Sequence, residues 1–256
     1  MRAAHPRAVI VAGGTFTGIL VRQGLLAPED WLSLQHVEEL RGIDTDDHLV
    51  AGAMVTHRRL ELHPAVAAGW DGVRQVFSVV ASPRVRNQAT IGGVLGDADY
   101  ASDPPAMLVA LGAWATVASV RGSRDVPVAD LIVDHYQTSL DGDELITHLH
   151  IPAGHQASVY RKLRTRSAED RPCVSVAAVI GASGEMRAAV GAVTGRPCWL
   201  PEACASWIPG DSGSNRAVAD AYAGAIEPIS DVRGSAEYRR HAIRVEVRRA
   251  LENLAR

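Results

Sequence analysis

The segment Ala12-Gly13-Gly14-Thr15 and its later counterpart Thr90-Ile91-Gly92-Gly93 decide how this chain folds. Each glycine pair follows a segment that is predicted to be extended, and each is expected to expose consecutive backbone N–H groups. Glycine permits positive φ and the close approach of a ligand, and the neighbouring threonine adds a hydroxyl donor. Either segment alone would be typical of an ordinary tight turn. Together, the two loops could hold one pyrophosphate group.

The first glycine loop does not match the common phosphate-binding motifs. Residues 13–18 fit neither G-x-G-x-x-G nor G-x-x-x-x-G-K-[ST], and no lysine follows the glycines. These mismatches argue against a Walker-type NTPase and against an ordinary Rossmann dinucleotide site. What remains is a pair of neutral backbone loops, far apart in sequence, that suits a long ligand with two phosphates such as FAD.

Further motifs accompany the glycine loops along the chain. They are Ser82-Pro83-Arg84-Val85-Arg86-Asn87-Gln88-Ala89 before the second loop, Asp99-Tyr100-Ala101-Ser102-Asp103-Pro104-Pro105, Asp143-Glu144-Leu145-Ile146-Thr147 with Ile151-Pro152, Tyr160-Arg161-Lys162-Leu163-Arg164-Thr165-Arg166, and Ser235-Ala236-Glu237-Tyr238-Arg239-Arg240-His241. In order and spacing they resemble the FAD-binding medium subunit of molybdenum hydroxylases, which includes the flavin subunits of carbon monoxide dehydrogenase and xanthine dehydrogenase. The resemblance covers nearly the whole chain.

The resemblance implies an α+β fold of the PCMH and CO dehydrogenase flavoprotein type. Such a fold has two N-terminal α/β subdomains and a C-terminal antiparallel sheet with helices. We expect an FAD-binding domain over 1–155, with subdomains at about 1–57 and 58–155, and a C-terminal CO dehydrogenase flavoprotein-like domain over 156–256. Only residues 1–7 precede the first expected strand, whereas most members of the family begin with an additional strand and helix, so the first subdomain is expected to be reduced at its N-terminus.

The apolar periodicity predicts the elements. Strands are expected at 8–11, 31–34, 48–56, 117–120 and 146–151, with an antiparallel hairpin formed by 174–180 and 186–193. Helices are expected at 15–23, from His57 onward, at 64–80 and 106–111, and at the end of the chain, where Ser235 is a plausible N-cap.

The resemblance also assigns cofactor contacts. It implies that the main chain of both glycine loops holds the FAD diphosphate, that the Thr90 hydroxyl contacts the cofactor, and that Asp103 accepts hydrogen bonds from ribityl or ribose hydroxyls. Ile146 and Lys162 match positions near the cofactor. The expected cofactor-binding residues are Ala12, Gly13, Gly14, Thr15, Phe16, Thr90, Ile91, Gly92, Gly93, Asp103, Ile146 and Lys162. No side chain is expected to be catalytic or to bind a metal.

Competing interpretations exist for three of these side chains and for the nearby Tyr160. Asp103 could be only the cap of the helix that follows it. Ile146 could be only a sheet residue, and Lys162 could belong to a solvated charged face, while Tyr160 could cover the isoalloxazine. These alternatives are decided by where each side chain points.

His148 and His150 form a second possible site. They lie two residues apart on an expected strand and so point to the same face, which is one metal-ligand geometry. A strand with one wet face has the same pattern, and no Cys or carboxylate partner is evident. We therefore favour the wet strand face.

The chain departs from the family pattern just after the second loop. Val94 stands where the family usually has asparagine, which removes a side-chain amide from the cofactor site. Asp97 stands where a small or neutral polar residue is more usual. A carboxylate that faced the diphosphate would oppose its binding.

Composition excludes several classes of protein. A formal net charge of −3 and a pI near 6.4 provide no basic field for nucleic acid. Three cysteines without a C-x-x-C pair are too few for an iron–sulfur cluster or a disulfide framework. No stretch approaches the roughly 20 apolar residues of a membrane span, and the apolar run after residue 7 is shorter than a signal peptide requires. A cytoplasmic setting is expected.

The function implied by the resemblance is that of an FAD-dependent oxidoreductase subunit. It would pass electrons from iron–sulfur clusters of a partner through FAD to an acceptor, with a molybdopterin-containing large subunit and a 2Fe-2S small subunit as partners. One alternative is a stand-alone flavoenzyme acting on a small molecule, or a divergent member of the family with a degraded flavin site. A purely structural scaffold without a cofactor is another.

Overall fold

The first glycine loop follows the first strand of a short parallel pair. In the computed structural model, which describes residues 8–255, β1 (Val9–Val11) pairs with β2 (Trp31–Ser33), and α1 (Thr17–Arg22) connects them. The helix is shorter than the expected 15–23, because Gly14 turns the chain with a φ of 70° before the helix begins. The expected reduction of this subdomain concerns residues 1–7, which lie outside the described residues.

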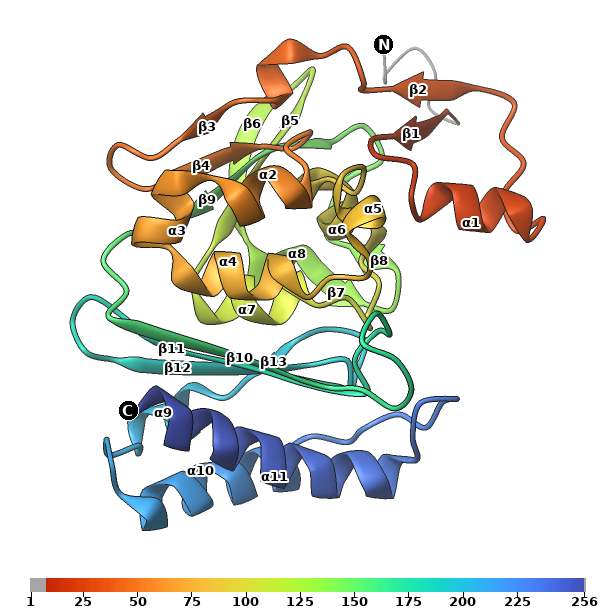
Figure 1. The fold of residues 1–256 in the computed structure, drawn as a ribbon. Coiled ribbons are helices and arrows are strands. Elements are labelled where there is room, and N and C mark those ends of the chain that lie inside the picture. Colours follow the sequence, from red (N-terminus) through yellow and green to blue (C-terminus); the bar gives the residue numbers. More distant parts are fainter. Residues whose placement is uncertain (1–7, 256) are drawn as a thin grey trace.

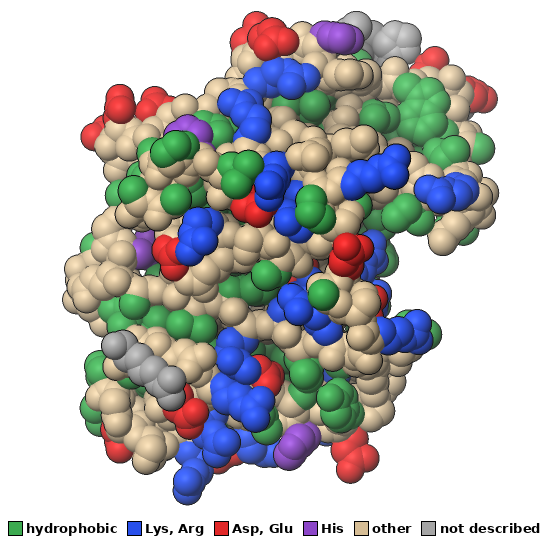
Figure 2. Space-filling model, viewed as in Figure 1, with side chains coloured by type: hydrophobic (Ala, Val, Ile, Leu, Met, Phe, Trp, Pro, Cys, Tyr) green, Lys and Arg blue, Asp and Glu red, His purple; other side chains and the backbone are tan. Residues whose placement is uncertain are grey.

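The first subdomain leaves hydrophobic side chains in contact with solvent. None of the α1 residues is buried, and Val21 and Trp31 are both more than two fifths exposed. Figure 2 shows hydrophobic side chains, in green, on the surface of this part of the molecule, at the upper right. Ile10 and Ala12 pack against a small buried cluster that includes Leu34, so this cluster and the pairing of β1 with β2 hold this part of the chain.

A five-stranded antiparallel sheet combines two strands from before residue 57 with three from after it. Its order is β3-β4-β9-β5-β6, from β3 (Ile43–Asp44), β4 (Leu49–Gly52), β9 (Leu145–Ile151), β5 (Trp114–Ser119) and β6 (Gly122–Pro127). Helices lie on the side of this sheet that faces the C-terminal strands, which are below it in Figure 1. They are α2 (His57–Leu62), α3 (Pro64–Gly69), α4 (Asp71–Ser78), α5 (Pro83–Arg86), α6 (Ile91–Asp97), α7 (Pro104–Ala110) and α8 (Val128–Leu131). The remaining short elements are the 3-10 helix η2 (Glu38–Leu40) and the pair β7 (Ile132–Asp134) and β8 (Gln137–Thr138).

Two elements that the sequence predicts between residues 48 and 80 are interrupted in the structure. The strand expected at 48–56 ends at Gly52, where the chain turns and the N–H of Val55 donates to the Gly52 carbonyl. The helix expected at 64–80 breaks at Trp70, whose φ of −136° and ψ of 58° are not helical. The indole Nε1 of Trp70 donates to the Pro152 carbonyl at 2.8 Å, so a tertiary contact overrides the helical periodicity.

The C-terminal part is a four-stranded antiparallel sheet with helices on its outer face. The order β10-β11-β12-β13 runs through β10 (Ala157–Leu163), β11 (Val174–Ile180), β12 (Met186–Gly191) and β13 (Cys198–Trp199), and α9 (Pro201–Ala205), α10 (Ser212–Ala225) and α11 (Ala236–Leu254) follow. The expected hairpin is confirmed by the pairing of β11 with β12. Ser235 caps α11 as predicted, because its Oγ accepts from the Tyr238 N–H at 3.2 Å.

One sheet separates two hydrophobic cores. Figure 1 shows β10–β13 between α4 and α7 on one side and α10 and α11 on the other. Along β11, Ala177 and Val179 belong to the core shared with α4 and α7, whereas Val176 and Ala178 belong to the core under α10 and α11. This alternation is the period of two of a strand whose faces are both buried.

Candidate cofactor site

A cavity of about 570 Å³ opens between the first glycine loop, α6 and the start of β9, a size typical of small-molecule sites. Residues of the C-terminal sheet and its loops also reach it. All the expected cofactor residues line this cavity except Ile91. The Ile91 side chain is fully buried in the core, and its backbone N–H donates to the Val55 carbonyl at 3.0 Å.

The first glycine loop presents free donors to the cavity. Gly13, Gly14 and Thr15 line it, and within residues 8–255 none of their backbone N–H groups has a hydrogen-bond partner. A Cβ on Gly13 would collide with the Gln88 carbonyl, so only glycine lets the loop lie this close to the segment around Gln88. Unpaired N–H groups in succession, around a residue with positive φ, form a concave anion-binding turn. The loop fits a phosphate group on this geometry.

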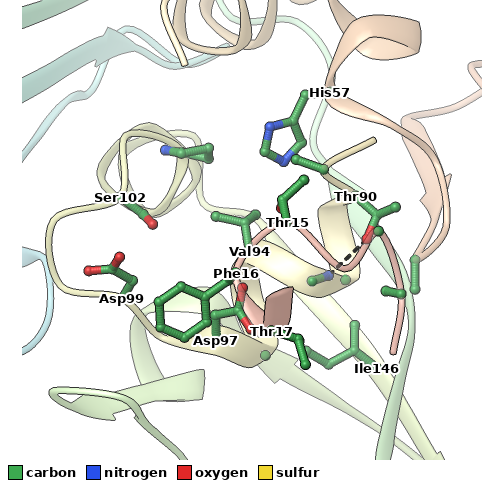
Figure 3. A pocket seen from close by; sticks show the side chains of 18 of the residues that line it. Thr15, Phe16, Thr17, His57, Thr90, Val94, Asp97, Asp99, Ser102 and Ile146 are labelled. Carbon is green, nitrogen blue, oxygen red and sulfur yellow. Dashed lines mark hydrogen bonds between the residues drawn. The ribbon is translucent and has the colours of Figure 1, made fainter. Parts of the chain in front are cut away.

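The second glycine pair differs from the expectation. It is the first turn of α6 and not a loop, and its N–H groups have partners in the protein: Gly92 donates to the Ala53 carbonyl at 2.8 Å, and Gly93 donates to Thr90 Oγ1 at 3.2 Å (Figure 3). A Cβ on Gly92 would lie 2.6 Å from the Ala53 Cβ. These glycines therefore allow close packing that brings the start of α6 to the cavity.

Asp103, Lys162 and Tyr160 form one buried cluster. Lys162 Nζ lies 2.8 Å from Asp103 Oδ2, and the Tyr160 hydroxyl donates to Asp103 Oδ1 at 2.8 Å. The Asp103 side chain makes no capping bond to α7, so the cap interpretation is wrong. The Lys162 side chain is 3% exposed, which also overturns the solvated-face interpretation. Tyr160 lies behind Asp103 and outside the cavity lining, so the structure does not place it over a flavin.

Burial works against the charges of the Asp103–Lys162 pair. It raises the pKa of Asp103 and lowers the pKa of Lys162, while each charge stabilises the other. The 2.8 Å contact with Lys162 and the Tyr160 hydrogen bond both favour the charged form of Asp103. The pair leaves the cavity wall here with no net charge.

Two of the other carboxylates that line the cavity stand side by side, and only one of these two has an ion pair. Asp99 is buried and lies 2.6 Å from Arg171, while no described cation pairs with Asp97 beside it (Figure 3). Burial, and then the Asp99 charge, raise the pKa of Asp97 to about 7. Near neutral pH this side chain is therefore protonated in about half of the molecules, which reduces its repulsion of an anionic ligand. Val94 also lines the cavity, as the sequence departure implied.

The sequence did not indicate two other lining residues. His57 was predicted only as the start of a helix, but its ring reaches the cavity near Thr15 and Thr90 (Figure 3). It is 2% exposed, and burial lowers its pKa to about 4, so the ring is neutral. Arg171 comes from the loop after β10. Neither residue lies in a recognisable pattern, because long-range packing alone brings them here.

Phe16 and Ile146 have different surroundings. Phe16 lies at the cavity and stacks on Tyr136, with ring centroids 5.8 Å apart and planes 9° apart. Ile146 is a residue of β9 that is 4% exposed and still lines the cavity, so its two interpretations, sheet residue and cavity contact, are compatible.

His148 and His150 lie on one face of β9, away from the cavity. His150 Nδ1 is 3.0 Å from His48 Nε2, and its ring stacks on Trp114 with centroids 5.1 Å apart. Among residues 8–255, no group of three His, Cys, Asp or Glu side chains gathers closely enough to hold a metal ion. The face is a hydrogen-bonded, aromatic strand surface.

Two family models match the chain in succession. The model described as FAD binding domain in molybdopterin dehydrogenase matches residues 1–154, and the CO dehydrogenase flavoprotein C-terminal domain matches residues 158–254. Each model also agrees with the fold, since the first covers the two N-terminal subdomains and the second covers the C-terminal sheet and its helices.

Individual relatives extend over almost the same length. The nicotine 6-hydroxylase medium subunit of Paenarthrobacter nicotinovorans is 33% identical over 94% of this chain and 88% of its own. The carbon monoxide dehydrogenase medium chain of Afipia carboxidovorans is 33% identical over 94% and 87%. A chain of the crystal structure of quinoline 2-oxidoreductase from Pseudomonas putida 86 superposes with a TM-score of 0.92 at 30% identity, covering 99% of this chain and 91% of that one.

Proposed function

Since this chain belongs to the FAD-binding subunits of the molybdopterin dehydrogenases, we propose that it holds FAD in the cavity between the first glycine loop and α6. The chain is an oxidoreductase subunit whose cofactor is FAD. The observation that carries the placement is the run of unpaired N–H groups at Gly13, Gly14 and Thr15. These groups would donate to the diphosphate, and Thr90 and the Asp103–Lys162 pair would stand along the same cavity.

The chemistry of electron transfer belongs to the cofactor, which can accept and release electrons singly or in pairs. The protein's own residues bind it and set its surroundings. Four of the cavity's carboxylates have ion pairs: Asp99 with Arg171, Asp103 with Lys162, Glu144 with Arg124 and Asp141 with Arg121. Near pH 7 about half of the Asp97 side chains are protonated. These ion pairs reduce the negative charge that a diphosphate would meet in the cavity, where Glu169 and Asp170 are the remaining carboxylates.

Two partner subunits complete the proposal. Relatives are named medium subunits or medium chains, which describes one component of a larger assembly. We expect a molybdopterin-containing large subunit that oxidises the substrate and a 2Fe-2S small subunit that delivers electrons to this chain. No cluster is assigned to this chain itself, because its three cysteines are free and two are buried in the hydrophobic core.

The domain division and the location are proposals of the same kind. We divide the chain into an FAD-binding domain over 1–155 and a C-terminal domain over 156–256, with subdomains meeting near residue 57. Within residues 8–255, none of the helices has the length and apolar character that crossing a membrane requires. We place the assembly in the cytoplasm, because the three cysteines remain thiols, as is usual in a reducing compartment.

The test is isolation of the tagged full chain from cells that also express candidate large and small subunits encoded beside it. We expect the purified material to contain stoichiometric FAD, released by heat and identified by chromatography, together with molybdenum and iron. FAD without the metals would support the stand-alone flavoenzyme. A colourless chain that FAD cannot reconstitute would overturn the proposed function.

A further inference from the structure

The motif Ser235–His241 has no contact with the cavity, yet its arginine is the most deeply buried charge described in the chain. Arg239 has no exposed surface. Its Nε donates to the Cys173 carbonyl at 3.1 Å, one terminal nitrogen donates to the Ile229 carbonyl at 2.8 Å, and the other donates to Asp231 Oδ1 at 2.8 Å. Burying a guanidinium is costly unless an ion pair and hydrogen bonds compensate it, and here these contacts also fix the position of Asp231.

That partner, Asp231, connects the C-terminal domain to the wall of the cavity. Its second oxygen, Oδ2, accepts from the Tyr100 hydroxyl at 2.9 Å and from Arg233 at 2.9 Å. Arg233 also donates to the Tyr100 oxygen at 3.1 Å and stands 5.9 Å over the Tyr100 ring. Burial alone would raise the pKa of Asp231, but the hydrogen bonds from Arg239, the Arg233 backbone and Tyr100 lower it below its usual range. Asp231 is therefore a fixed anion.

Tyr100 lies in the middle of the segment that forms one wall of the cavity. Asp99, Ala101, Ser102 and Asp103 all line the cavity, whereas Tyr100 points away from it. The segment leaves α6 through Ala98, whose φ of 44° is unfavourable for a residue with a Cβ. Such a turn persists only where surrounding contacts hold it. Tyr100 supplies a contact from outside the cavity.

We propose that Arg239 and Asp231 are positioning residues for the cofactor, which act through the Tyr100 hydroxyl to hold the 98–103 segment in its binding-competent shape. This inference rests on the proposed FAD site. The C-terminal domain thus contributes to cofactor binding through residues that never touch the cofactor. Without the hydrogen bond between Tyr100 and Asp231, the flavin-free protein samples other conformations of residues 98–103. FAD then binds only the molecules in the competent conformation.

The quantitative expectation follows from that selection. The apparent dissociation constant is the intrinsic one divided by the fraction of molecules in the competent shape. A hydrogen bond to a charged group contributes enough that its loss can lower this fraction to about one tenth. We therefore expect removal of the Tyr100 hydroxyl to raise the FAD dissociation constant about tenfold.

Tyr222 offers a matched control. Its hydroxyl also donates one bond, to the Ala188 carbonyl, and accepts one, from the Leu200 N–H at 3.0 Å, but it is buried in the core under α10 and α11. The experiment compares Tyr100→Phe with Tyr222→Phe in the full chain stripped of flavin. FAD affinity is measured by quenching of flavin fluorescence, the bound flavin by visible circular dichroism, and apo stability by urea unfolding.

The expected result is specific to one variant. Tyr100→Phe should weaken FAD binding about tenfold and alter the flavin dichroism, and Asp231→Asn should act in the same direction. Tyr222→Phe should lower the urea midpoint and leave the FAD dissociation constant within twofold of wild type. Equal FAD affinity in wild type and Tyr100→Phe, or equal weakening in both tyrosine variants, would overturn the positioning role. Wild-type protein that binds no FAD would instead overturn the proposed site.

Discussion

At the scale of single residues, two glycines of the first loop have different tasks. Gly13 packs against the Gln88 carbonyl, where a side chain cannot fit, while a Cβ on Gly14 would have only Val11 nearby, at 3.8 Å. Gly14 is instead required by its φ of 70° and by the free N–H groups around it. Substitution at Gly14 therefore probes the ligand more than the packing.

We expect Gly14→Asp to abolish FAD binding, because it places a side chain and a negative charge beside the phosphate donors. Gly24→Asp is the control: Gly24 also has a positive φ, 71°, with nothing within 4 Å, and it does not line the cavity. Both variants should lose a similar stability, about 1–2 kcal/mol, from the strained backbone. Flavin absorbance per chain after reconstitution checks this, and full occupancy in Gly14→Asp would refute the loop assignment.

Asp97 should make the stability depend on pH. Burial and the Asp99 charge raise its folded pKa from 3.8 to about 7, so between these values the folded state binds a proton that the unfolded state has released. Stability from this group is thus full below about pH 4 and is lost as pH rises to about 7. Asp97→Asn should match wild type most closely at pH 4 or below, and at pH 8 we expect it to be more stable by about 4 kcal/mol, because each pKa unit corresponds to about 1.4 kcal/mol.

Urea unfolding of both proteins across pH 4–8 measures this difference. The affinity for FAD should follow the same course, since ionised Asp97 repels a diphosphate: wild type should bind more weakly above pH 7, and Asp97→Asn should show a flatter profile. Parallel stability profiles for the two proteins would show that Asp97 titrates normally.

The sequence could predict which residues gather at the cavity but not how they pair. The glycine motifs and Asp103 stand in local patterns, and all of them line the cavity. Asp103 and Lys162 are 59 positions apart, and their ion pair depends on α7 packing against the sheet that contains β10. The charged residues around Lys162 are typical of a solvated face, because a sequence pattern does not show which of the side chains are buried.

At the scale of elements, the second glycine pair shows how a helix can imitate a loop. Two glycines lower helix propensity, which favoured a loop, but Thr90 caps the helix and Gly92 lets it approach Ala53. The break at Trp70, whose indole bonds to the Pro152 carbonyl, has the same explanation. In each case a contact distant in sequence decided where the element begins or ends.

The packing of α6 gives a paired prediction within one helix. Gly92→Ala would force a Cβ to 2.6 Å from the Ala53 Cβ, and we expect it to cost about 1–3 kcal/mol through overpacking. Gly96→Ala has nothing within 4 Å and should stabilise the helix by about 0.5–1 kcal/mol. Urea unfolding of the flavin-free proteins measures both. Equal effects at the two positions would contradict this packing of α6.

At the scale of the whole molecule, the shared sheet joins the two domains into one cooperative unit. Val176 and Val179 are both fully buried, but they face opposite cores of β11. We expect the chain to unfold in one transition, and Val176→Ala and Val179→Ala should each lower that same transition by about 2 kcal/mol. Far-ultraviolet dichroism and tryptophan fluorescence should coincide. Two transitions, each lowered by one variant only, would contradict the shared sheet.

The fold class was predictable at this scale because its motifs are spread along most of the chain. The α+β architecture and the C-terminal antiparallel sheet followed from the resemblance and are confirmed by the structure. The doubly buried β11 carried its own signal, an apolar run from Val174 to Ile180. The helices on either side of it were not predictable as a pair, because periodicity gives a helix its apolar face but not its partner.

The shared sheet also governs the order in which the protein can be completed during synthesis. Residues 1–154 are made first, yet the faces of α4 and α7 that pack on β10–β12 have no cover until Gly191 has been added. At about 5–20 residues per second, this interval lasts seconds. If a ribosome pauses between Pro152 and Gly191, the apolar faces of α4 and α7 therefore stay exposed on the nascent chain. Holding chaperones would be needed during that interval.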